Sequence, residues 1–361
     1  MKLRISTSCV ALAAITSSLL VAACGDKVLD FRNAQINNGK VYAGDSNTPF
    51  SGKLTSIPAN SILRSQQGVQ RLASFVGDLG NAAPYGGAVP YSICDASIHD
   101  GEPDGEIVCK PEQSDTVIVT GKFSDGVVDG PYTVYDKTGN TRTIEATFRN
   151  GALEGKVKVY SSQTGKPIVT TTWDAGVLNG DEEAFDETTG NRVLHATLVN
   201  GKYDGAFTRY APDGKQIIYQ ANFAQGQHDG DEETFDPQSG KMTGQAHYAN
   251  GKLDGVVRHW NADGSLLDEK TYANGVDVAA AKAASDAAAA ADEKRQHEPQ
   301  DIEACVNKRR EEVTQKNGGF APPAAEMTWR EDCTSEIDAA IIDTARNASP
   351  QPAPTKSTLS N

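Results

Sequence analysis

The chain has 361 residues and a formal net charge of -14, with 34 Lys and Arg against 48 Asp and Glu. This length allows two or three domains, and the acidity argues against nucleic acid as a partner, because phosphate binding needs clustered Lys and Arg. Hydrophobic residues make up 38% of the chain, a low share that favours a thin, repetitive or extended fold over a thick core.

Residues 1–23 have the features of an export signal. Two cations in MKLR precede a short run of apolar and small residues, which is too brief for a membrane-spanning helix of about 20 residues. The stretch VAAC at 21–24 resembles a bacterial lipobox, although an ordinary secreted protein with a chance Cys is the alternative. The resemblance implies that Cys24 becomes the N-terminus and is anchored in the bacterial cell envelope by acyl chains such as palmitate. Gly25 at the next position favours the outer membrane over the inner.

Residues 24–56 are expected to hold a tether and a first, interrupted copy of the repeat found further along, NNGKVYAGDSNTPFSGKL at 37–54. Residues 57–115 form an insertion. Within it, apolar residues at helical spacing predict an amphipathic helix; they are Ile62, Val69, Leu72, Val76 and Leu79. We expect the insertion to cap one end of the sheet, where an edge strand would otherwise expose its backbone groups. A binding loop is the alternative.

Four cysteines remain once Cys9 in the signal and Cys24 at the lipobox are set aside: Cys94, Cys109, Cys305 and Cys333. An even number in an oxidising compartment predicts two disulfides. Four Cys allow three connectivities, and proximity in the sequence favours local pairing within the first two and within the last two. Their spacing matches no zinc-ligand pattern, so we expect no metal at these residues.

A 25-residue period fills residues 116–277 and dominates the chain. Six units begin with a G-x-x-x-G segment, which is the signature of a repeat fold. The glycines are Gly126, Gly130, Gly151, Gly155, Gly176, Gly180, Gly201, Gly205, Gly226, Gly230, Gly251 and Gly255. We interpret each segment as a turn, because Gly, Asn and Asp tolerate positive φ.

Each unit then reads as two short strands. The second strand alternates apolar and polar residues, which predicts one buried face, and it ends on Phe148, Trp173, Leu198, Phe223, Tyr248 or Tyr272. Short turns leave only antiparallel neighbours. The expected fold is therefore mainly β: an elongated antiparallel β-meander of about six 25-residue repeats, with a small disulfide-stapled insertion and a C-terminal helical hairpin.

These glycine and aromatic positions resemble MORN-type repeats, and more closely the bacterial MORN-like variant of YwqK-type antitoxin proteins. The resemblance covers 116–277 and is specific for the repeat rather than for one function. It implies a role in toxin neutralisation by association, while many members are lipoproteins of no assigned role.

The C-terminal part is expected to be helical. Residues 278–298 are rich in Ala and favour a helix, and charged residues within it argue against membrane insertion. Residues 299–347 read as a helical hairpin that needs its Cys305–Cys333 staple, because so small a unit buries little core. Residues 348–361 are expected to be disordered.

Two acidic stretches, GDEEAFD at 180–186 and GDEETFD at 230–236, are the strongest candidates for a reactive site. They begin four strands apart, about 19 Å across a sheet, whereas paired catalytic carboxylates lie about 5–9.5 Å apart. We therefore expect no catalytic residue, no metal site and no cofactor. His195 and His247 are expected at solvated strand positions, and the acids are interpreted as surface residues.

The sequence favours a non-enzymatic, lipid-anchored envelope protein whose repeats act as a binding or scaffold surface. Its partners are the membrane, through the lipidated N-terminus, and a protein. The first alternative is an immunity protein that neutralises a toxin, since an acidic surface suits a basic partner. The second alternative is an envelope enzyme acting on glycans.

Overall fold

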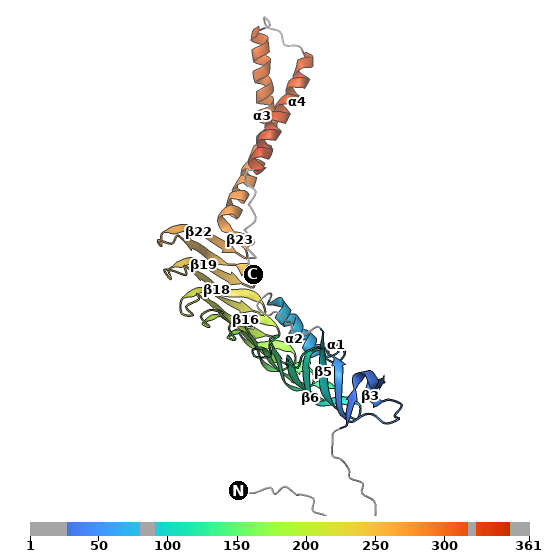
Figure 1. The fold of residues 1–361 in the computed structure, drawn as a ribbon. Coiled ribbons are helices and arrows are strands. Elements are labelled where there is room, and N and C mark those ends of the chain that lie inside the picture. The colour runs from blue at the N-terminus through green and yellow to red at the C-terminus, as the bar shows by residue number, and fades with distance from the viewer. Residues whose placement is uncertain (1–26, 80–90, 317–322, 347–361) are drawn as a thin grey trace, which may run out of the picture.

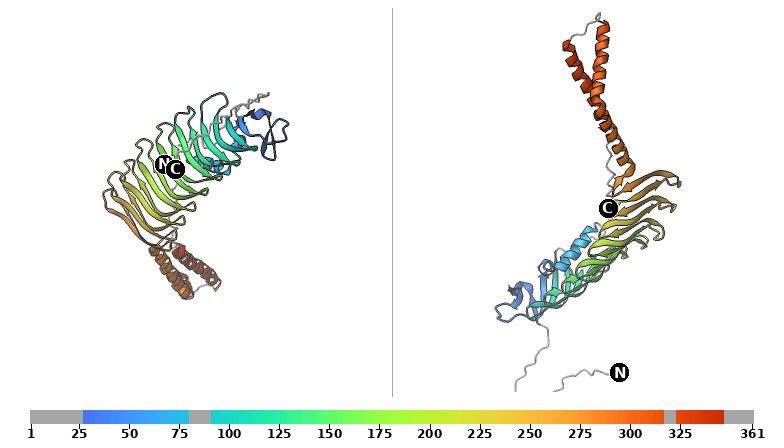
Figure 2. Two further views of the ribbon diagram at one scale, coloured as in Figure 1. Left: turned by 90° about the horizontal axis from the view of Figure 1, so that it is seen from below. Right: turned by 180° about the vertical axis from the view of Figure 1, so that it is seen from behind.

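The computed structural model describes residues 27–79, 91–316 and 323–346. The predicted signal at 1–23, the lipid site Cys24 and the tail at 348–361 lie outside the described residues. Within these ranges the protein is mainly β, with one 21-stranded sheet, one two-stranded sheet and two long C-terminal helices. The large sheet forms a curved tape, and the helices project from its C-terminal end (Figures 1 and 2).

The N-terminal third supplies η1 (Phe31–Asn33), α1 (Ala59–Ile62), α2 (Gln67–Asp78) and the strands β1 (Val28–Asp30), β2 (Ala34–Asn37), β3 (Lys40–Ala43), β4 (Gly52–Pro58), β5 (Ser92–His99), β6 (Glu102–Pro111), β7 (Val119–Ser124), β8 (Val127–Val128) and β9 (Gly130–Tyr135). The middle supplies β10 (Arg142–Arg149), β11 (Ala152–Leu153), β12 (Gly155–Tyr160), β13 (Pro167–Asp174), β14 (Val177–Phe185), β15 (Arg192–Val199), β16 (Lys202–Tyr210) and β17 (Ile217–Ala224). The C-terminal part supplies β18 (Gln227–Phe235), β19 (Met242–Ala249), β20 (Lys252–Leu253), β21 (Gly255–Trp260), β22 (Leu266–Ala273), β23 (Val276–Asp277), α3 (Val278–Lys316) and α4 (Pro323–Arg346).

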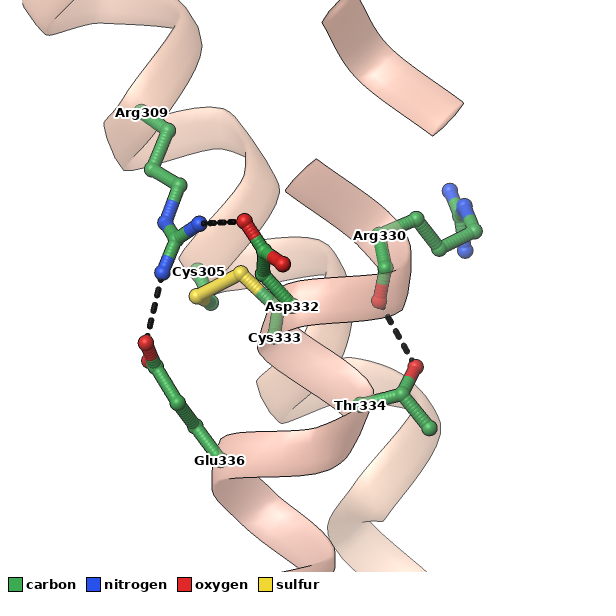
Figure 3. Close-up of a disulfide and its surroundings, with 7 residues drawn as sticks. All are labelled: Cys305, Arg309, Arg330, Asp332, Cys333, Thr334 and Glu336. Carbon is green, nitrogen blue, oxygen red and sulfur yellow. Dashed lines mark hydrogen bonds and ion pairs between the residues drawn. A yellow bond between two sulfur atoms is a disulfide. The ribbon is translucent and has the colours of Figure 1, made fainter. Parts of the chain in front are cut away.

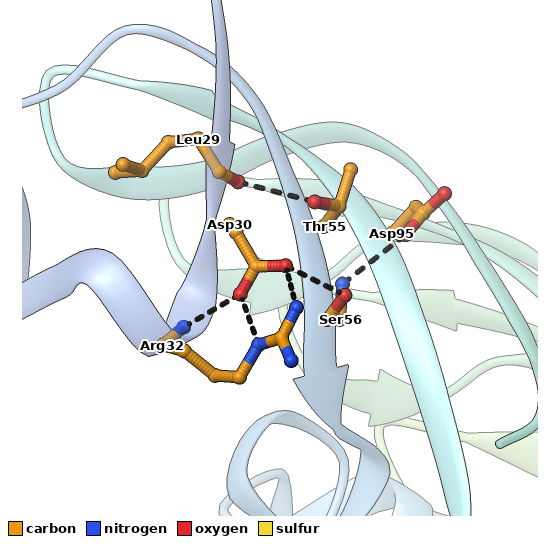
Figure 4. A network of polar contacts seen from close by, with 6 residues as sticks. All are labelled: Leu29, Asp30, Arg32, Thr55, Ser56 and Asp95. Atoms are coloured by element: carbon orange, nitrogen blue, oxygen red, sulfur yellow. Dashed lines mark hydrogen bonds and ion pairs between the residues drawn. The ribbon is translucent and has the colours of Figure 1, made fainter.

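From β4 onward each strand pairs antiparallel with a strand next to it in the sequence. At the N-terminal edge β1 instead joins β4 in parallel. Asp30 stabilises this edge by accepting hydrogen bonds from the Arg32 side chain at 2.8 Å and from Ser56 Oγ at 3.2 Å (Figure 4). The Arg32 guanidinium holds the pKa of the Asp30 carboxyl well below its usual range.

The repeated turns lie one position earlier than the sequence indicates. In the Asn150–Gly151 pair both residues have positive φ, 50° and 80°, the geometry of the tight hairpin turns that match sheet twist. The second glycine of each segment lies instead at a bulge. Between the Trp173–Leu178 and Thr171–Glu182 pairs, β14 carries two more residues than β13, and Gly180 at φ 120° lies there. The G-x-x-x-G prediction of one turn is therefore wrong: it is a turn glycine followed by a bulge glycine.

The acidic residue before each bulge glycine has a structural role that the sequence did not indicate. The Asp129 carboxylate accepts a hydrogen bond from the Asn150 amide at 3.1 Å, and Asp229 accepts one from the Asn250 amide at 3.1 Å. Each carboxylate therefore stabilises the turn of the following unit, 21 residues along the chain.

One face of the sheet, here called the inner face, is the one that α2 covers. Val69, Leu72 and Val76 of α2 are at most 3% exposed and pack into the main core. The helix prediction is confirmed for these residues, whereas Ile62 belongs to the separate helix α1. The end-cap prediction is wrong, because β5 and β6 pair between β4 and β7 within the sheet and α2 lies on its face.

Both disulfides form as proposed. Cys94 and Cys109 lie opposite each other on β5 and β6 and are bonded, and Cys305 of α3 is bonded to Cys333 of α4. Beside the second bridge, Arg309 reaches Asp332 at 3.0 Å and Glu336 at 2.7 Å across the two helices (Figure 3).

The C-terminal helices differ from the predicted division at 298 and 299. A single helix, α3, continues through Pro299 from the Ala-rich segment into the stapled pair. Strong helix formers on both sides outweigh the one backbone hydrogen bond that proline removes. No helix in the described ranges is long and apolar enough to cross a membrane.

Candidate binding surface

The inner face changes character where α2 ends. The helix reaches as far as Trp173 on β13, where the Phe75 and Trp173 rings meet edge to face with centroids 5.5 Å apart. Figure 2 shows α2 along the N-terminal half of the tape. We call the inner-facing residues beyond it, on β14 to β21, the open inner face; its large side chains are Glu182, Leu198, Tyr203, Phe207, Tyr219, Phe223, His228, Glu232 and Tyr248.

One row of side chains shows how the face changes. Positions 25 residues apart occupy the same place in successive units, and the row runs Tyr132, Val157, Glu182, Phe207, Glu232 and Val257. Tyr132 and Val157, in the half that α2 covers, are 1% and 0% exposed. The middle acid of each acidic stretch therefore occupies a position that is core elsewhere in the sheet.

This placement corrects the interpretation of both acidic stretches as surface residues. Asp181 and Glu183 do lie on the outer face, opposite Thr197 and His195. Glu182 points the other way, into a row between buried Thr171 and buried Ala196. Alternation along β14 indicates that the faces differ, but the sequence does not say which of them is inward.

Glu182 is held by one tyrosine. The Tyr203 hydroxyl reaches over Ala196 and donates to Glu182 Oε2 at 3.1 Å. Burial raises the pKa of Glu182, and the hydrogen bond from Tyr203 offsets part of that rise. Burial, followed by the charge of Glu182, also raises the pKa of Tyr203. No ion pair to Glu182 is present in the described part of the chain, so its charge is poorly compensated.

Glu232 lies in a second polar cluster two units further along. The Tyr219 hydroxyl donates to Glu232 Oε2 at 3.0 Å, and His228 Nδ1 lies 3.3 Å from the same oxygen. Tyr219 and His228 are also 3.4 Å apart. Burial is the main cause that raises the pKa of Tyr219, and the Glu232 charge adds to it.

Aromatic rings connect the two clusters, and we call them the aromatic ladder. The ring centroids of Tyr203 and Phe207 are 5.2 Å apart, and those of Phe207 and Phe223 are 5.8 Å apart. His228 continues the ladder, 4.3 Å from Phe223 and 4.8 Å from Tyr248. Aromatic contacts of this kind add about 0.5–1.5 kcal/mol each beyond burial. The ladder is therefore a rigid, partly exposed apolar surface with two carboxylates set into it.

Sequence reasoning identified only part of this ladder. Phe223 and Tyr248 were expected on the buried face as strand ends, and the register confirms this. Tyr203 and His228 were missed because they lie in the segment interpreted as a turn. Their signal is their shared place two residues after the turn glycine, where other units carry Val128, Leu153, Leu178 and Leu253.

The outer face carries isolated polar pairs. His247 Nδ1 lies 2.7 Å from Asp231 and His195 Nε2 lies 3.6 Å from Asp181, with the histidine side chains 49% and 34% exposed. The expectation of solvated histidines is confirmed. No group of three metal-ligating side chains occurs within residues 27–79, 91–316 and 323–346. Glu182 and Glu232 are also four strands apart, about 19 Å, too far to act as one acid–base pair.

Comparison with known proteins gives no family. No family model and no curated protein matches the sequence. Among solved structures, a crystal structure of an S. aureus TarM mutant in complex with fondaparinux, alpha-GlcNAc-glycerol and UDP is 13% identical, with a TM-score of 0.20, over 28% of this chain and 19% of that chain. A second TarM crystal structure has a TM-score of 0.19 over the same shares. The chain thus spans about a fifth of TarM, and the likeness carries no argument about fold or function.

Proposed function

We propose that this chain is a lipid-anchored cell-envelope protein that binds a protein partner through the open inner face and performs no catalysis itself. The observation that supports this most strongly is the change along one row of the sheet. The same positions that are sealed under α2 at Tyr132 and Val157 continue as the aromatic ladder without a covering helix. Soluble proteins rarely expose such contiguous apolar surface unless it binds something.

The proposed anchor gives this surface a position relative to the membrane. With a lipid on Cys24, four residues connect the membrane surface to Val28 at the start of β1, a reach of about 13 Å. The β1–β4 edge then lies close to the membrane, and the tape and its helices extend away from it (Figure 1). The Gly25 position supports the outer membrane as the location.

We also propose that the strands from β7 onward are MORN-like repeats. In support, the turn pairs Asp125–Gly126, Asn150–Gly151, Asn200–Gly201 and Asn250–Gly251 all have positive φ at the same interval. A repeated unit explains why one face can be built from equivalent positions whose side chains differ from unit to unit.

The test is affinity capture after chemical cross-linking of the full chain in its own membranes. We expect one stoichiometric protein partner, and we expect the double variant Phe223→Ser, Tyr248→Ser to lose it. The matched control is Gln220→Ser with Asn222→Ser, on the outer face of the same strand. Capture that survives the inner-face variant and fails in the control would contradict the proposal. A toxin as the captured partner would favour the immunity role.

The anchor is tested separately by Cys24→Ser. We expect the mature chain to move from the membrane fraction to the soluble fraction, because the acyl chains supply the membrane affinity. A variant chain that stays in the membrane fraction would contradict lipidation at Cys24.

A further inference from the structure

We infer that the open inner face accepts a basic amphipathic helix from the partner protein, lying in line with α2. This inference rests on the proposed function and specifies the chemistry of the partner. It is argued from how α2 itself packs on the first half of the same face.

The period of a helix matches the period of this sheet. Gly68 of α2 lies so close to Phe148 that an added Cβ would be 2.8 Å from its ring and 2.1 Å from the Gly151 carbonyl oxygen. Seven residues later, Phe75 packs against Trp173, which is 25 residues after Phe148. Seven helical residues rise about 10.5 Å, and two strands advance about 9.6 Å. One heptad therefore crosses one unit of the sheet.

The open inner face continues this spacing. Leu198, Phe223 and Tyr248 follow Trp173 at intervals of 25 residues on the same face. A helix placed in line with α2 would meet them at every seventh residue. Its contact positions would therefore be apolar side chains repeated over about three heptads.

Charge defines the second property of the helix. Glu182 and Glu232 are two units apart, which corresponds to about two heptads of the helix. Glu182 has only Tyr203 to stabilise its charge, and Glu232 has Tyr219 and His228. Lys or Arg at positions two heptads apart would pair with both carboxylates in a partly dry setting, where such pairs are strong.

The first half of the face already shows a helix placing a cation on this surface. The guanidinium carbon of Arg71 lies 5.9 Å from the Trp173 ring centroid, on the side chain against which Phe75 packs. Arg209, the cation on the open inner face, belongs to a neighbouring row and is exposed. The row of Glu182 and Glu232 is therefore the place for a basic side chain from the partner.

A designed peptide tests this inference on the full mature chain. The probe is a fluorescently labelled helical peptide of about 25 residues, with Leu at every seventh position and Lys at two positions two heptads apart. We expect saturable binding by fluorescence anisotropy. Glu182→Gln with Glu232→Gln should weaken it by at least about tenfold, and Phe223→Ser should abolish it.

The controls separate this inference from the proposed function. Glu183→Gln with Glu233→Gln, on the outer face, should leave peptide affinity unchanged, and a peptide with Glu in place of Lys should bind at least about tenfold more weakly. No binding of the basic peptide, or equal binding of the acidic one, would overturn the inference while leaving cross-linked capture of a partner intact. A homodimer that Phe223→Ser dissociates would also overturn it, because a second copy would then cover this face.

Discussion

Glu182 combines two properties that rarely occur together in a β-sheet. Its slot belongs to the row of buried Tyr132 and Val157, yet it carries a carboxylate whose only hydrogen-bond donor among the described residues is the Tyr203 hydroxyl. Burial of a carboxylate without a cation destabilises its charged form. The chain therefore keeps at this position a residue that costs folding stability, which is expected of a binding residue more than of a core residue.

Glu182→Gln should make the protein more stable at neutral pH. The pKa of Glu182 is raised in the folded state, so the folded chain binds more protons than the unfolded chain just above pH 4.5, and stability falls as pH rises through that window. The amide removes this loss, and we expect the midpoint of thermal unfolding to rise by about 1–3 °C at pH 7. Differential scanning calorimetry from pH 4 to 8 measures it.

The control for this experiment is Glu183→Gln, one residue away on the outer face. Glu183 forms an ion pair with Arg192 at 2.9 Å, and surface pairs of this kind contribute little. This variant should not gain stability with rising pH. A Glu182→Gln midpoint at or below that of the parent chain at pH 7 would show that the carboxylate is not destabilising.

At the scale of elements, α2 determines where the face is closed. Gly68 is required because its Cα approaches the Gly151 carbonyl and the Phe148 ring. Gly68→Ala should therefore push α2 away and lower the free energy of unfolding by about 1–3 kcal/mol. Gly77→Ala, in the same helix with no atom within 4 Å of its added Cβ, should instead stabilise by about 0.5–1 kcal/mol. Urea unfolding of both variants decides, and equal effects would contradict this account of α2.

The helical pair should depend on its own disulfide. Ile302, Val306 and Cys333 form a small cluster separate from the main core, so Cys305→Ser with Cys333→Ser should remove about 3–4 kcal/mol from the pair. Limited proteolysis should then cut within α3 and α4 and spare the sheet. Cys94→Ala with Cys109→Ala is the contrasting variant, since these residues are fully buried in the main core. Cleavage of the sheet in the first variant would show that the two units are coupled.

Element by element, local patterns were predictable and distant contacts were not. Cys94 and Cys109 could be paired from the sequence because they lie on neighbouring strands. The amphipathic pattern of α2 was also readable, but its target, about eighty to a hundred residues further on at Phe148 and Trp173, leaves no local trace. The bulge at Gly180 was missed because a turn and a bulge both require positive φ.

At the scale of the whole molecule, the chain is a long asymmetric tape. Sixteen steps between paired strands separate β1 from β22, a path of about 75 Å. The 39-residue α3 adds about 58 Å. The half of the sheet nearest the proposed anchor is closed by α2, and the distal half carries the open inner face. This arrangement presents the binding surface away from the membrane, where a partner can reach it.

The central claim is that the open inner face, and not the outer face, contacts the partner. Phe223 and Asn222 are adjacent on β17 and point to opposite faces, so they form a matched pair for site-specific photo-crosslinking with benzoylphenylalanine in the full-length, membrane-anchored chain. The account predicts one discrete cross-linked product from position 223 and none from position 222. A product from position 222 with none from position 223 would contradict it.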